Sequence, residues 1–139
     1  MKKSLFNPTP AQIKYRNRLW ALELLKNKRK ARETMRDSHG GRCCLAVAED
    51  VARSICGKDF QQGDEGYPSR DTQAFFGWNR KDPYLTIDGE EYRASDCNDG
   101  GIVCANEKIR YKGLSHAQIA ELVVNTFVVT KKKKLSFSI

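Results

Sequence analysis

The chain has 139 residues, of which 40% are hydrophobic and 30% charged, and its formal net charge is +8. These values fit one globular domain spanning residues 1–139, with residues 1–8 and 130–139 as extensions of it. They argue against a membrane span, because no apolar run approaches the ~20 residues that a bilayer requires. Asn7 and Pro8 interrupt the apolar stretch at the N-terminus, so we expect a cytosolic protein.

The charge is distributed unevenly along the chain. Residues 1–42 carry a net charge of +9, residues 43–110 carry −5, and residues 111–139 carry +4. Two basic ends therefore flank an acidic middle. This layout predicts a polyanionic partner for the ends, or head-to-tail self-association.

The first predicted helix begins after Thr9 and runs to about Lys30. Thr9 and Gln12 form a capping box, and Pro10 suits the first helical position. Its apolar face is expected to hold Ile13, Trp20 and Leu24, widened by Leu22 and Leu25.

A bend at residues 37–41 precedes a second helix, which we expect to be the central core helix. It should end at Cys56, with Gly57 as a left-handed cap. Its apolar face is predicted to comprise Cys44, Val47, Ala48, Val51 and Ile55. The polar residues on or beside the opposite face are Glu49, Asp50 and Arg53.

The middle of the chain predicts a surface loop over residues 58–73, a buried aromatic turn over 73–78, and a β-hairpin over 84–93. The Asp88-Gly89 pair between two short strands is a strong type I′ turn signal. Residues 95–101 are rich in Asp, Asn and Gly, so we expect a tight loop there.

A second capping box, Ser115 with Gln118, opens a C-terminal helix. We expect Ile119, Leu122 and Val123 to face inward. Residues 127–129 and 135–139 are predicted strands, with lysines 131–134 as a turn or as the protected end of an edge strand. The prediction is a compact α+β domain with two N-terminal helices, a central β-hairpin, a C-terminal helix and a terminal strand or hairpin.

The strongest electrostatic feature is a cluster of cations at the end of the first helix and in the bend after it. Its members are Lys26, Lys28, Arg29, Lys30, Arg32, Arg36 and Arg42. Such a cluster would attract a nucleic acid or an anionic nucleotide. The simpler interpretation is a solvated helix end. Asn98 and Asp99 are a second candidate, either as ligand contacts or as an Asx turn that orients the next segment.

The five cysteines are candidate metal ligands and candidate nucleophiles. An odd count of five favours reduced thiols over a disulfide framework. Cys43 and Cys44 lie near a predicted helix N-terminus beside Arg42 and His39, an arrangement that would lower a thiol pKa. Cys44 nevertheless falls on the apolar face. The spacing of Cys43, Cys44, Cys56, Cys97 and Cys104 differs from that of zinc modules. We therefore predict buried free thiols, with no catalytic residue, metal or cofactor, and an exposed His116 without a functional role.

Several segments together resemble a family of small, uncharacterised phage and prophage proteins. The matching positions cover most of residues 16–124 and follow the family's order. They are Trp20, Leu24 and Asn27, then Cys43, Cys44, Leu45, Val47 and Asp50, then Phe75, Phe76 and Gly77, then Asn98, Asp99 and Gly101, and finally Ile119, Ala120 and Leu122. Ala46 and Glu49 depart from the pattern, which usually has glycine and cysteine there. The resemblance implies a phage origin and an accessory role in the host cytoplasm, and no particular reaction.

These observations predict a phage accessory protein that binds an anionic host target without catalysis. It would block a bacterial defence component or sequester its nucleotide signal, so its partner would be a host protein, a nucleotide or a nucleic acid. One alternative is a sequence-tolerant nucleic-acid binder. The other is a virion or assembly protein that forms homo-oligomers through its C-terminal strand.

Overall fold

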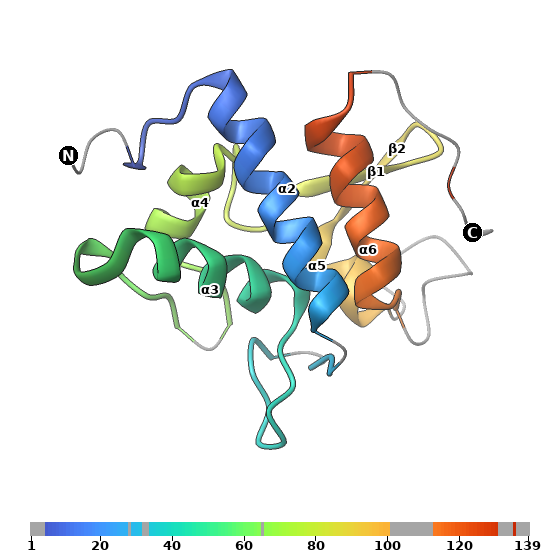
Figure 1. Cartoon of the computed structure of the whole chain (residues 1–139). Coiled ribbons are helices and arrows are strands. Elements are labelled where there is room, and N and C mark those ends of the chain that lie inside the picture. The colour runs from blue at the N-terminus through green and yellow to red at the C-terminus, as the bar shows by residue number, and fades with distance from the viewer. Residues whose placement is uncertain are drawn as a thin grey trace.

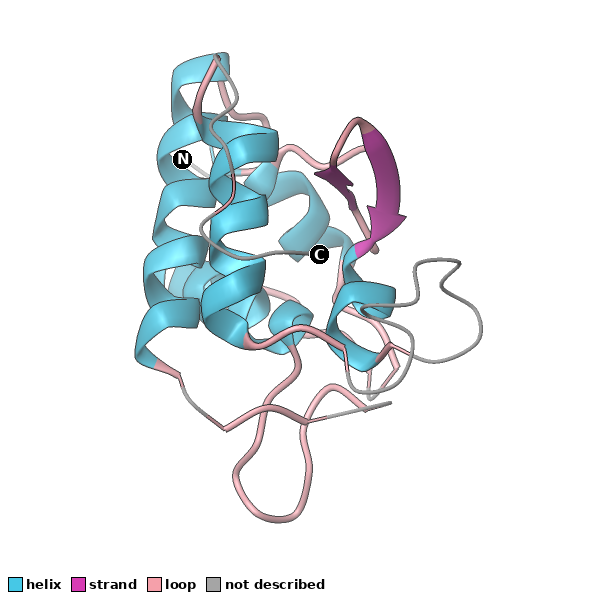
Figure 2. Cartoon of the chain, turned by 90° about the vertical axis from the view of Figure 1, so that its right-hand side faces the viewer, coloured by secondary structure: helices cyan, strands magenta, loops and turns pink. Residues whose placement is uncertain are grey.

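The computed structural model describes residues 5–27, 29–31, 34–64, 66–100, 113–130 and 135. Its elements are helices α2 (Pro10–Lys26), α3 (Cys44–Cys56) and α4 (Arg70–Phe76), strands β1 (Tyr84–Ile87) and β2 (Glu90–Arg93), helices α5 (Ala94–Asp99) and α6 (His116–Val123), the 3₁₀ turn η1 (Gly57–Asp59) and the π-helical segment η2 (Val124–Val128). The predicted α+β class is confirmed. Helices dominate, and the two strands form a hairpin at one edge (Figure 1, Figure 2).

Helix α2 packs against α3, α4, α6 and η2, so it shares the centre of the fold with α3 (Figure 1). The predicted capping box is present, since Thr9 Oγ1 accepts from Gln12 N and Gln12 Oε1 accepts from Thr9 N. The helix ends at Lys26, earlier than predicted. Trp20 and Leu24 are buried, whereas Leu22 and Leu25 remain about half exposed. The prediction that these two leucines widen the buried face is therefore wrong.

Three aromatic rings join α2, α3 and α4. Trp20 is fully buried, and its Nε1 donates to the carbonyl of Cys44 at 2.8 Å. Its ring lies 5.0 Å from that of Trp78, which stacks on Phe76 at 4.9 Å. Asn17 completes the junction by donating to the Phe76 carbonyl and accepting from Trp78 Nε1. The short aromatic turn predicted at 73–78 is thus confirmed as buried, and its helix begins earlier, at Arg70.

Helix α3 ends at Cys56 as predicted, but two residues lie on unexpected faces. Ile55 is 47% exposed, whereas Glu49 is fully buried. Glu49 Oε1 accepts from Gly63 N, Ser69 N and Thr72 Oγ1. The prediction that Glu49 lies on the polar face of this helix is wrong. Its buried carboxylate instead accepts hydrogen bonds from the loop after α3 and from the start of α4.

The hairpin matches its prediction over residues 84–93, with Leu85 opposite Tyr92 and left-handed φ values at Asp88 and Gly89. On the outer side of β1, Thr86 N donates to Thr126 Oγ1 of η2 at 3.0 Å. The loop predicted at 95–101 is instead helix α5 up to Asp99. Asp82 supports its first turn by accepting from both the backbone and the hydroxyl of Ser95.

The C-terminal helix has the predicted capping box and buries Ile119, Leu122 and Val123. Residues 127–128 belong to η2, so the strand predicted at 127–129 is wrong: the chain stays helical, and Val129 N donates to Val124 O. The predicted turn at 131–134 and strand at 135–139 lie outside the described residues, apart from Leu135. None of the described helices combines the length and apolar character needed to cross a bilayer.

His116 is buried, which corrects the prediction of an exposed side chain. Its Nδ1 lies 2.7 Å from the carbonyl of Asn27, which fixes the ring proton on that nitrogen. Burial lowers the pKa of His116 below the usual 6.5, and the nearby cations Lys30 and Arg42 add to this effect. At a pH just below 6.5, His116 therefore binds a proton more readily in the unfolded chain than in the folded protein.

We expect the free energy of unfolding to fall as the pH drops below about 6.5, because the unfolded chain then binds a proton that the folded state does not. His116→Asn keeps a donor for the Asn27 carbonyl but cannot titrate, so its stability should depend less steeply on pH. Urea unfolding over a pH series measures this, with His39→Asn at an exposed position as the control. If the free energy of unfolding changed equally steeply with pH in His116→Asn and in the parent protein, the lowered pKa of His116 would be contradicted.

Candidate binding surface

The predicted cationic cluster is divided in the structure. Lys28 and Arg32 lie outside the described residues. Lys26 is exposed at the end of α2, and Arg29 is exposed while its Nη1 donates to the His39 carbonyl. Lys30 is half-buried, and its Nζ donates to the carbonyls of Asn98 and Leu114. Lys30 therefore caps the end of α5.

Arg36 and Arg42 converge on Asp50 of α3. Arg36 Nη2 donates to one carboxylate oxygen at 2.6 Å, and Arg42 Nη1 donates to the other. Burial by itself would raise the pKa of Asp50, but these hydrogen bonds hold it below its usual value. Arg53 is a third guanidinium on the same carboxylate, at 3.0 Å. Two of the seven predicted cations, Arg36 and Arg42, are thus paired with a carboxylate within the fold.

Asn98, a candidate ligand contact, is fully buried at a junction of backbone segments. Its Oδ1 accepts from Cys44 N at 3.0 Å, and its Nδ2 donates to the Ala31 carbonyl at 2.8 Å. Nδ2 also donates to Asp99 Oδ1. The side chain consequently joins α5 to the N-terminus of α3 and to the segment before it.

Asp99 lines a cleft of about 290 Å³ with Cys43, Ser95 and Tyr67. His39 is not among the described residues that line this cleft. Cys43 is the N-cap of α3, and its Sγ accepts from Ala46 N and donates to Met35 Sδ. Burial raises the pKa of the Cys43 thiol to about 11, despite the nearby amide donors. The sequence-based expectation of a lowered pKa at this helix end is therefore wrong.

The other described cysteines are also buried free thiols, and burial raises the pKa of Cys44 well above its usual value. Cys104 lies outside the described residues. Within the described ranges, no three His, Cys, Asp or Glu side chains are grouped so as to hold a metal ion.

The exposed face of α2 carries two cations, Lys14 and Arg18, and several apolar side chains that lie outside the predicted cationic cluster. Tyr15, Leu22 and Leu25 are 62%, 48% and 51% exposed. Lys14 and Arg18 are exposed on the same face, and Lys26 follows at its end. Glu23, the one acid of α2, is half-buried and lies 4.0 Å from Arg42 Nη2. The exposed charges of this helix are therefore all positive.

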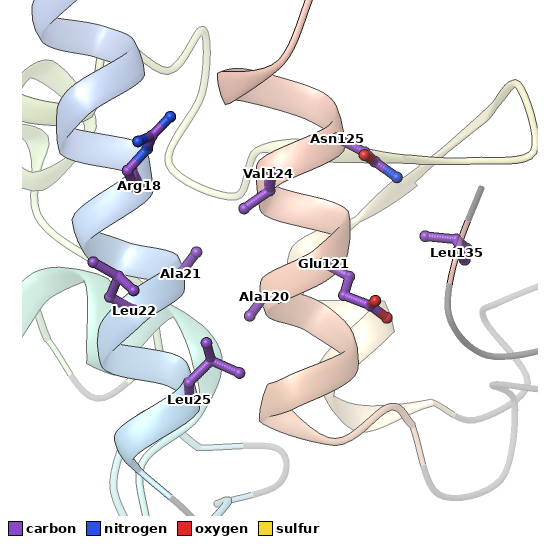
Figure 3. Close-up of a pocket in the computed structure, with 9 residues that line it drawn as sticks. All are labelled: Arg18, Ala21, Leu22, Leu25, Ala120, Glu121, Val124, Asn125 and Leu135. Atoms are coloured by element: carbon purple, nitrogen blue, oxygen red, sulfur yellow. The ribbon is translucent and has the colours of Figure 1, made fainter. Parts of the chain in front are cut away.

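A groove of about 230 Å³ runs between α2 and α6. Leu22 and Leu25 project from α2 beside Ala120 of α6 and Val124 of η2 (Figure 3). Further lining residues are Arg18, Ala21, Glu121, Asn125 and Leu135. The spacing of Lys14, Arg18, Leu22 and Leu25 could have indicated this face, because residues three or four apart share one side of a helix.

No known protein family, curated protein or solved structure matches the chain. The resemblance to small phage proteins therefore stays a prediction, and function is inferred from the surface itself.

Asn98→Ala should lower the free energy of unfolding by about 2–4 kcal/mol, because it leaves the buried Cys44 N–H and Ala31 carbonyl without this partner. Asn79→Ala, at an exposed position, should change it by less than about 0.5 kcal/mol. Urea unfolding of both variants tests the structural role. Unchanged stability in Asn98→Ala would contradict it.

Native protein treated with iodoacetamide near pH 8 should retain unmodified Cys43 and Cys44. With a pKa of about 11, only about one Cys43 thiol in a thousand is ionised at that pH, and burial limits access as well. Peptide mass spectrometry after timed quenching measures modification residue by residue, with urea-unfolded protein as the positive control. Rapid stoichiometric modification of Cys43 would identify a reactive thiol.

Proposed function

We propose that the protein acts by binding, without catalysis, an acidic surface of another protein through the exposed face of α2. Following the resemblance to phage accessory proteins, that partner belongs to a bacterial host, and binding blocks it. The observation that carries the proposal is the pairing of an apolar groove with an exposed helix face whose charges are all positive.

An amphipathic helix with acidic flanks has the chemistry that complements this face. Its apolar residues would cover Leu22 and Leu25, which together with Ala120 and Val124 give the groove an aliphatic lining. Its acidic residues would meet Lys14, Arg18 and Lys26. Such charges speed the association of the two proteins and set the orientation of the partner helix. Burial of the apolar residues at the centre of the interface supplies most of the affinity.

The arrangement favours a protein partner over a nucleic acid. Polyanion binding uses a continuous track of cations, often with aromatic rings on which bases stack. Here the centre of the surface is aliphatic, and Lys30, Arg36 and Arg42 are occupied by partners within the fold. Tyr15 is the one aromatic residue among the exposed large hydrophobics of α2.

The test uses tagged protein expressed in bacterial cells, with crosslinked partners quantified by mass spectrometry. Arg18→Glu/Lys26→Glu and Leu22→Ser should each lower recovery of one host protein by about tenfold or more, because they remove charge complementarity and apolar contact separately. The matched control is Lys58→Glu/Arg70→Glu, which reverses two exposed cations outside α2 and should leave recovery unchanged.

Thermal unfolding confirms that each variant is folded, and calorimetry with the purified partner then gives the affinities. Equal recovery of every host protein by all variants would overturn the proposal. Binding to a DNA duplex that weakens steeply with salt and is lost in Arg18→Glu/Lys26→Glu would assign the face to nucleic acid instead. Concentration-dependent oligomers abolished by Leu22→Ser would assign it to self-association.

A further inference from the structure

A third hollow, of about 270 Å³, lies outside α2 and α6. Cations line it, although residues 43–110 have a net negative charge. It is lined by Tyr67, Arg80, Lys81, Asp82 and Arg93. Three cations from the segment before β1 and from the end of β2 therefore face one opening. None of them belongs to the N-terminal cluster from which an anion site was predicted.

Arg80 is held in place and keeps donors available. Its guanidinium lies over the ring of Tyr84, 4.8 Å from the centroid, and its Nη1 donates to Tyr84 Oη at 2.9 Å. Its Nε is buried, so only the Nη groups of Arg80 can donate to a ligand in the hollow. A guanidinium fixed on one side with unused N–H groups is suited to the forked hydrogen bonds that phosphate accepts.

One of the residues that line the hollow, Asp82, is acidic, and two further carboxylates lie near the cations. Asp82 is buried, and both of its carboxylate oxygens accept from Ser95 at the start of α5. Asp64 lies near Lys81, and Asp96 near Arg93. Within the described part of the chain, none of the three lining cations lies within 4.0 Å of a carboxylate oxygen. The lining therefore has a positive excess.

Tyr67 supplies an aromatic side chain at the edge of the hollow, and this residue is 53% exposed. Its loop is fixed from both sides. Asp64 Oδ1 accepts from Gly66 N and Tyr67 N, and buried Glu49 accepts from Gly63 N and Ser69 N. A Cβ on Gly63 would come within 2.5 Å of the Tyr67 carbonyl, so the loop requires glycine there. Tyr67 also lines the neighbouring cleft that contains Ser95 and Asp99.

We propose that this hollow binds a nucleotide, with its phosphate on Arg80, Lys81 and Arg93 and its base against Tyr67. Phosphate is the anion whose charge and geometry match the cations, and every nucleobase offers a flat face for a tyrosine ring. The cleft beyond Tyr67 has room for groups that extend from the base. This site goes beyond the proposed docking of a protein on α2 and shares no residue with it.

Isothermal titration calorimetry with AMP, ribose 5-phosphate, adenosine and inorganic phosphate tests the proposal. AMP should bind more tightly than each of the other three, because it alone engages both the cations and the ring. Lys81→Gln/Arg93→Gln should weaken AMP binding by about tenfold, since two charge-assisted contacts are lost. Tyr67→Leu should bring the affinity for AMP close to that for ribose 5-phosphate.

Lys58→Gln, at another exposed cation, should leave AMP binding unchanged. Arg18→Glu/Lys26→Glu should leave it unchanged as well, so failure of this site is distinguishable from failure of the α2 surface. All substituted positions are exposed or half-buried, and thermal unfolding verifies that the variants fold. The proposal is overturned by the absence of AMP binding up to about 5 mM. It is equally overturned by AMP affinity that survives Lys81→Gln/Arg93→Gln.

Discussion

Burial of Trp20 is the constraint on which the arrangement of helices depends. Its indole N–H donates to the carbonyl of Cys44 at the start of α3, while its ring packs on Phe76 and Trp78 around the end of α4. One side chain thereby sets α2 against two other helices. Because this side of α2 faces inward, the residues on its other side, among them Arg18 and Leu22, are left on the surface. The proposed docking face is thus a direct result of how the core is built.

The parts of the fold that the sequence predicts are those with local signals. The turn at Asp88-Gly89 and the two capping boxes involve residues within a few positions of one another, and all three are confirmed. The burial of Glu49 was missed because its partners, such as Ser69, lie in a later loop. The role of Asn98 was missed for the same reason, since one of its partners, Ala31, is 67 residues away in the chain.

Candidate sites are harder to predict than the fold, because the sequence does not show which cations pair with carboxylates in the folded protein. Arg36 and Arg42 count toward the basic N-terminal segment, yet Asp50 accepts hydrogen bonds from both. Conversely, Arg80 and Arg93 belong to a segment with a net negative charge, but folding brings them to one hollow with Tyr67. Net charge per segment therefore indicated an anionic partner in general, while the positions of usable cations emerged only from the fold.

The contact between Thr86 and Thr126 has a consequence for how the hairpin can be extended. A strand at the edge of a sheet normally presents free backbone donors that can template another strand. In β1 the outward N–H of Thr86 is occupied by a side chain from η2, and η2 itself packs against that edge. A strand from a second molecule would have to add alongside β2, where Glu90 and Glu91 are exposed. The π-helical segment η2 thus blocks the addition of a strand on one side of the hairpin.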